Sequence, residues 1–134
     1  MEEIIKEIAE LIDSGEVVFF HRETHEILSY PAPDRSGYNE FDYLAEKVLA
    51  ITDANPEAYI QFDPPETRES YKIMEGFVET LKNEQLKGLL MDTLNSKKPF
   101  RNFRNAVETE NIEDDWYDYK DAYLEMSVSD KLLS

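Results

Sequence analysis

The sequence contains no cysteine, only two histidines and four glycines, and no long apolar run. Without cysteine the chain has no disulfide, no thiolate nucleophile and no cysteine metal ligand. The four glycines are too scattered to form a phosphate-binding loop, and no serine lies in the Gly-x-Ser-x-Gly pattern of a nucleophile elbow. No apolar stretch approaches the ~18 residues that a membrane-spanning helix needs. The familiar sequence signals of an enzyme and of a membrane protein are therefore missing.

Positive charge is scarce as well. The 134 residues hold 14 Lys and Arg against 30 Asp and Glu, a formal net charge of -16 at pH 7. Such a charge repels nucleic acid and anionic membranes, so we expect neither as a partner. The first residues carry acids where a signal peptide needs cations, which indicates a cytoplasmic protein. The charge pattern leaves the oligomeric state open.

Hydrophobic residues make up 41% of the chain and aromatic residues 12%, which is enough for a packed core despite the charge. At this length we expect a single domain over residues 1–134. Its last residues, 127–134, are predicted to be a frayed tail.

The spacing of apolar residues predicts the secondary structure. Residues 16–30 are typical of a β-hairpin around a polar turn, residues 31–37 of a loop, and residues 58–62 of a third strand. Apolar residues at helical spacing lie at 4–12, at 41–49 including Phe41, at 73–81 and at 86–94. A fifth helix is expected to be capped by Ser96, with Pro99 in its first turn, and a sixth to begin at about Ile112. We therefore predict an α+β fold: a small three-stranded sheet, made of a hairpin plus one strand, packed by about six helices, with a helical C-terminal half.

One stretch departs from the acidic character of the chain, because residues 93–107 contain no acid. Four cations there are interleaved with two aromatic residues, and we call these six the basic island: Lys97, Lys98, Phe100, Arg101, Phe103 and Arg104. On a helical wheel the two aromatic residues share an apolar face, with Arg104 at its edge. The last helix presents Trp116 and Tyr119 on its own apolar face. The candidate ligand- or partner-binding residues are therefore Phe100, Arg101, Phe103, Arg104, Trp116 and Tyr119.

Two interpretations of the basic island are open. In the structural one, Arg101 or Arg104 stacks on Trp116 or Tyr119, or pairs with Asp115, and so ties two helices together. In the functional one, the arginines face an aromatic cleft and bind an acidic or phosphorylated group. A planar guanidinium suits this role because it holds a carboxylate or phosphate through two parallel hydrogen bonds.

The two histidines are the remaining candidates for metal binding. His21 and His25 flank the predicted hairpin turn, with Glu23 between them. These are metal-ligand residue types, but the zinc-protease pattern needs His-Glu-x-x-His on a helix, and this segment is typical of strand and turn. We therefore predict no metal site, no cofactor and no catalytic residue.

Several segments also resemble a known family. They are "VVFFHRETHEILSY", "YIQFDPPETRESYKIMEGFVETL", "KKPFRNFRNAV" and "WYDYKDAYL". Together they make the chain similar, over nearly its whole length, to the uncharacterised bacterial family of the UPF series, number zero-one-five-eight. The resemblance implies that the basic island and Trp116 belong to a family pattern, and that the family usually has glycine where this chain has His25. It implies no activity, because the function of that family is unknown.

The sequence favours a non-enzymatic cytoplasmic interaction or adaptor module. Its partner surface is either the acidic exterior, which suits a basic protein, or the groove of arginines and aromatic residues, which suits an acidic peptide or a phosphate. The alternative is an enzyme or anion-binding protein that uses the same cleft on an anionic substrate. In that case a carboxylate such as Glu69 or Glu75 would act as a base.

Overall fold

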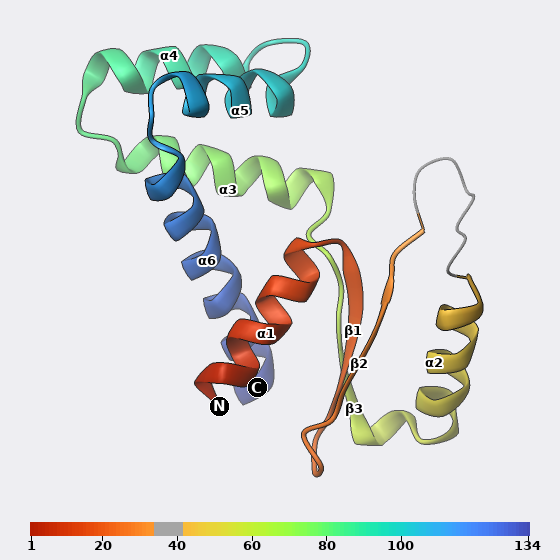
Figure 1. The fold of residues 1–134 in the computed structure, drawn as a ribbon. Coiled ribbons are helices and arrows are strands. Elements are labelled where there is room, and N and C mark those ends of the chain that lie inside the picture. The colour runs from red at the N-terminus through yellow and green to blue at the C-terminus, as the bar shows by residue number, and fades with distance from the viewer. Residues whose placement is uncertain (34–41) are drawn as a thin grey trace. The chain divides into compact units, whose positions relative to one another are not determined.

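The computed structural model describes residues 1–33 and 42–134 (Figure 1). The predicted loop over 31–37 lies mostly outside these residues, and so does Phe41. The described chain forms two compact units: unit 1 is Met1–Pro65 with Leu124–Ser134, and unit 2 is Glu66–Tyr123. The single domain expected from the length stays a prediction.

Unit 1 is built on a three-stranded antiparallel sheet. In the order in which they pair, its strands are β2 (Ile27–Pro31), β1 (Glu16–His21) and β3 (Tyr59–Phe62). In the register of the sheet, Val17 of β1 lies opposite Tyr30 of β2, and Val18 lies opposite Phe62 of β3. The predicted hairpin and third strand are both present, and with six α-helices among the described residues the α+β fold class is confirmed.

Helices cover both faces of β1, which explains its unbroken apolar run. Besides the end of the last helix, unit 1 includes α1 (Glu2–Asp13), α2 (Asp42–Ala54) and the short 3₁₀ helix η1 (Pro56–Ala58). Val17 and Phe19 pack with Val48 of α2 on one face. Val18 and Phe20 are buried on the other face, where α1 lies against β1 (Figure 1). Side chains alternate between the faces of a strand, so four consecutive buried residues require cover on both sides.

Unit 2 consists of packed helices. In chain order they are α3 (Thr67–Thr80), α4 (Glu84–Leu94), α5 (Pro99–Thr109) and the first part of α6 (Glu113–Leu133). α4 contacts both α3 and α5 (Figure 1). The core of the unit is a cluster of buried apolar side chains: Met74, Phe77, Val78, Leu90, Leu94, Phe103 and Val107.

The start of α5 differs in part from the prediction. Pro99 stands in its first turn as expected, but the N-cap residue is Lys98, whose side chain makes no capping hydrogen bond. Ser96 instead donates from Oγ to the carbonyl oxygen of Thr93 (2.6 Å) and accepts from Nδ2 of Asn102 (2.8 Å). The serine therefore links the end of α4 to the first turn of α5, and the prediction that it caps α5 is wrong.

The end of the chain also differs from the prediction, because residues 127–134 do not form a frayed tail. α6 continues almost to the C-terminus, and Val128 is only 1% exposed. The ammonium of Lys131 donates to the carbonyl oxygen of Gln61 and lies 5.2 Å from the centre of the Phe62 ring. The burial of Val128 and the contacts of Lys131 with β3 thus hold the last turns in place, which local composition does not reveal.

Tyr30 gives unit 1 a pH-dependent contribution to stability. Burial raises the pKa of its phenol above the ordinary value of 10.0, and the carboxylates of Asp63 and Asp53 raise it further by repelling the phenolate. Because the folded pKa is the higher one, we expect the stabilisation to be complete at neutral pH and to be lost as the pH rises above about 10. Thermal melts between pH 8 and 11 should therefore fall more steeply for the wild type than for Tyr30→Phe, and parallel curves would contradict this.

Candidate partner-binding site

The side chains of α5, which include most of the basic island, fall into a buried group and an exposed group. Phe103 and Val107 point into the core of unit 2 and are almost completely buried. Arg101 and Arg104 are exposed, and Phe100 is 38% exposed at the first turn. Only one of the two predicted aromatic residues of α5 is therefore available at the surface.

α6 contributes an aromatic cluster that packs on α3 and α5. The Trp116 ring centre lies 5.4 Å from that of Phe77 and 5.0 Å from that of Phe103. The Tyr119 ring centre lies 5.7 Å from that of Phe77. Separations and tilted or edge-on geometries of this kind are favourable for aromatic pairs. Trp116 and Tyr119 are thus partly buried and pack against the core of unit 2.

A cavity of about 320 Å³ opens where α3, α5 and α6 meet. Four of the six candidate residues line it, namely Phe100, Phe103, Arg104 and Trp116. Arg101 and Tyr119 are not among the lining residues. The remaining wall comes from residues that the sequence analysis did not assign to the site: Met74, Val107, Glu108, Tyr117 and Lys120. We call this the first cavity.

The cation that stacks on the aromatic rings is Lys120, and not an arginine. Its Nζ lies 5.9 Å from the centre of the Trp116 ring and 5.3 Å from that of the exposed Tyr117 ring. Residues four apart on a helix are neighbours, so the Trp116–Lys120 spacing in the sequence is the signal that could have identified this contact. The structural interpretation, in which Arg101 or Arg104 fills this role, is not what the geometry shows.

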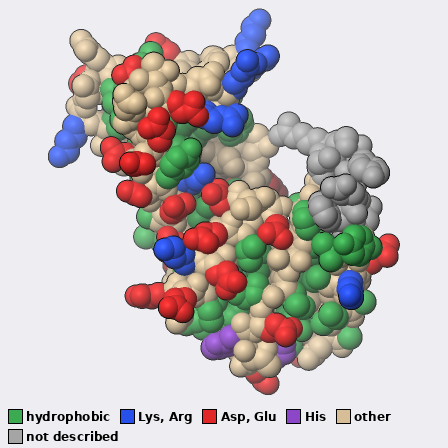
Figure 2. Space-filling view, viewed as in Figure 1, with side chains coloured by type: hydrophobic (Ala, Val, Ile, Leu, Met, Phe, Trp, Pro, Cys, Tyr) green, Lys and Arg blue, Asp and Glu red, His purple; other side chains and the backbone are tan. Residues whose placement is uncertain are grey.

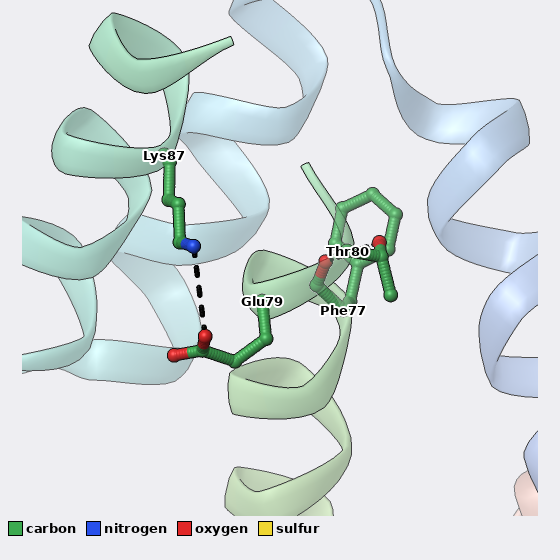
Figure 3. Close-up of polar contacts among 4 residues, drawn as sticks. All are labelled: Phe77, Glu79, Thr80 and Lys87. Carbon is green, nitrogen blue, oxygen red and sulfur yellow. Dashed lines mark hydrogen bonds and ion pairs between the residues drawn. The ribbon is translucent and has the colours of Figure 1, made fainter. Parts of the chain in front are cut away.

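The two arginines of α5 have no partner in the part of the chain that the structure describes. Among residues 1–33 and 42–134, neither guanidinium makes an ion pair or a hydrogen bond. Lys87 of α4 shows the contrasting case, because its ammonium lies 3.6 Å from the carboxylate of Glu79 on α3 (Figure 3). Both guanidiniums are therefore exposed and have no carboxylate partner among the described residues.

The charges are distributed unevenly between the two units. Unit 2 holds nine Lys and Arg against thirteen Asp and Glu, whereas unit 1 holds five against seventeen. The net charge of unit 2 is therefore -4 and that of unit 1 is -12. Figure 2 shows Lys and Arg side chains gathered on the part of the surface formed by the helices of unit 2. An anion approaching the first cavity thus meets much less repulsion from its own unit than the total charge suggests.

Tyr119 has a structural position that its sequence pattern does not indicate. Its hydroxyl occupies the place where a Cβ at residue 76 would stand, and the adjacent ring carbon, Cζ, lies 3.4 Å from that place. Gly76 thus allows the Tyr119 ring to approach α3 closely, which accounts for a glycine in the interior of a helix.

A second cavity, of about 570 Å³, also has Phe100 in its wall. Its other lining residues come from α3 and the first residue of α5: Thr67, Arg68, Tyr71, Lys72, Glu75 and Pro99. Of the two carboxylates considered as a base, Glu75 therefore lies beside Arg68 rather than beside Arg101 or Arg104. Glu69 lines neither cavity. Neither of these two carboxylates lines the first cavity, whose wall has Glu108 instead.

Both histidines have structural roles at the hairpin turn. Nδ1 of His21 accepts hydrogen bonds from the backbone amides of Glu23 and Thr24, both at 3.1 Å. His25 has a φ of 64°, in the left-handed region that favours glycine, and its ring packs 5.3 Å from that of Phe20. Within the described ranges, no three His, Cys, Asp or Glu residues are placed to hold a metal ion.

Comparison with known proteins identifies the relatives of the chain. Residues 2–133 match the "Uncharacterised protein family (UPF0158)". The chain belongs to this family. Its relative in Pseudomonas aeruginosa, the UPF0158 protein PA5073, is 29% identical over 99 residues, which are 73% of this chain and 58% of that protein. The chain therefore spans less than two thirds of the length of this relative. No solved structure matches it.

Membership of UPF0158 confirms the resemblance inferred from the sequence. The structure also bears on the one position, His25, at which this chain departs from the expected family pattern. The position at which the family is expected to have glycine is His25, and its left-handed backbone gives the physical reason for that glycine. The family itself is uncharacterised, so membership assigns no activity. Across the described part of the chain, no helix is both long and apolar enough to cross a membrane.

Proposed function

We propose that this member of UPF0158 is a cytoplasmic, non-enzymatic interaction module, and that its first cavity binds an acidic segment of a partner protein. The observation that carries the proposal is that Arg104 lines an aromatic cavity and, like Arg101 three residues before it, is exposed. Neither arginine has an ion-pair partner among the described residues, in a chain of net charge -16. A carboxylate placed there gains a bidentate guanidinium partner.

The surroundings of Arg104 support a peptide rather than a small free ion. The cavity wall has aromatic surface from Phe100 and Trp116, and Lys120 adds a second cation above the Trp116 ring. Aromatic and arginine side chains at a shared pocket are the usual anchors of protein interfaces. A segment with both carboxylates and carbon-rich side chains matches this wall better than an inorganic anion does.

The test is the binding of a synthetic acidic peptide, eight residues long, with six Asp or Glu around a central Leu-Phe pair. Trp116 is the only tryptophan of the chain and lines the cavity, so its emission reports occupancy directly. We expect Arg104→Glu to weaken binding by at least about 10-fold, the effect of losing a hydrogen-bonded ion pair. Lys82→Glu is the matched control, because it changes the charge of unit 2 equally at an exposed site away from both cavities.

Two further results decide between this proposal and its alternatives. The double variant Arg101→Ala, Arg104→Ala should lose peptide binding while its melting temperature stays close to that of the wild type, because exposed substitutions change stability by only about 0.5 kcal/mol. A clear fall in melting temperature would instead support the structural interpretation. Equal weakening by Arg104→Glu and Lys82→Glu would show a general charge effect and refute the site. If the protein instead preferred a basic peptide, the partner surface would be the acidic exterior and not the first cavity.

A further inference from the structure

The second cavity adjoins the first through Phe100, and its walls differ in character. Tyr71, Pro99 and Phe100 give it a largely apolar lining. The hydroxyl of Tyr71 donates to the carbonyl oxygen of Leu94 (2.9 Å), so the part of this residue that is left for a ligand is its ring. A volume of about 570 Å³ is within the range that binds an organic ligand or a large side chain. The cavity therefore suits an apolar group.

Two cations stand at this cavity. Arg68 and Lys72 are exposed, lie four residues apart on α3, and have no ion-pair or hydrogen-bond partner among the described residues. Like charges at this spacing destabilise a helix, as do Arg101 and Arg104 three apart on α5. Phe100 thus shares the second cavity with Arg68 and Lys72 and the first cavity with Arg104, while Arg101 follows Phe100 directly on α5. An anionic ligand that reaches both pairs would relieve both repulsions.

We propose that the acidic segment bound by this protein carries a bulky apolar residue that fills the second cavity, with carboxylates on either side of it. The carboxylates on one side pair with Arg68 and Lys72, and those on the other side with Arg101 and Arg104. This inference rests on the proposed function, and it specifies the ligand as an acidic segment with an apolar anchor. Phe100, which borders both cavities, is the residue that separates the anchor from the first cavity.

The experiment compares the Leu-Phe peptide with a peptide of identical charge in which Ala-Ala replaces the central pair. Burying a large apolar side chain should make the Leu-Phe peptide bind at least about 10-fold more tightly. Phe100→Ala, at an exposed position, removes the shared wall and should reduce that preference to less than about 3-fold. Arg68→Ala with Lys72→Ala should weaken both peptides, because both carry the same acids.

The outcomes separate this inference from the proposed function. If both peptides bind the wild type equally and Arg104→Glu still weakens binding at least about 10-fold, the acidic site stands and the apolar anchor is refuted. If the preference for Leu-Phe survives Phe100→Ala unchanged, the anchor lies elsewhere and the assignment to the second cavity is wrong. If neither peptide binds, both proposals fail.

Discussion

Phe103→Ala is expected to lower the free energy of unfolding by about 3–5 kcal/mol, the usual loss when a buried phenylalanine is truncated. Phe103 is 1% exposed and sits between two aromatic partners, with ring centres 6.4 Å away in Phe77 and 5.0 Å away in Trp116. Truncation removes both contacts and leaves a void that the helices of unit 2 cannot close completely. Urea denaturation followed by far-ultraviolet circular dichroism measures this loss without relying on Trp116 as the probe.

Phe100→Ala is the matched control for this prediction. It is the same substitution one turn earlier on α5, at a side chain that is 38% exposed. We expect a change of less than about 1 kcal/mol, because little packed surface is lost. Equal losses for the two variants would mean that Phe100 is part of the core, and the surface role proposed for it would then be untenable.

The sequence predicted the elements of the fold well, because their apolar periodicity is strong. The run Val17–Phe20 lies in the predicted hairpin, and α1 and α2 cover its two faces. Two details of the structure could not be predicted from the local sequence. Val128 is ordered by burial and Lys131 by contacts with β3, and Ser96 bonds across a helix junction. Each depends on residues distant along the chain or on the geometry of a turn.

The candidate site was predicted less completely, for a physical reason. A helical wheel assigns a direction to each side chain but does not show where a neighbouring helix ends. Phe100 and Phe103 share a face of α5, yet only Phe103 is covered. Arg104 was placed correctly at the edge of the apolar stripe, whereas the cation on Trp116 proved to be Lys120 from the same helix. The face of the helix on which a side chain lies was predictable, and its burial by a neighbouring helix was not.

Gly76→Ala is expected to destabilise the protein even though alanine is the better helix former. In an open helix the change would stabilise by up to about 1 kcal/mol. At this position the new methyl group meets the Tyr119 hydroxyl, and the ring behind that hydroxyl is held against Phe77. Moving the ring gives up the aromatic contact, and such overpacking costs about 1–3 kcal/mol. We expect a net loss of about 1–2 kcal/mol in urea denaturation.

Gly88 and Tyr119 provide the two controls that isolate this clash. A Cβ at Gly88 meets nothing within 4 Å, so Gly88→Ala on α4 should stabilise by about 0.5–1 kcal/mol. Tyr119→Phe removes the hydroxyl and leaves the ring carbon at 3.4 Å, a distance that a methyl group tolerates. The double variant Gly76→Ala, Tyr119→Phe should therefore be more stable than Gly76→Ala alone, with a coupling of about 1 kcal/mol or more in the double-mutant cycle. Additive effects would show that the hydroxyl is free to move aside, and that the glycine in α3 is not required by the approach of Tyr119.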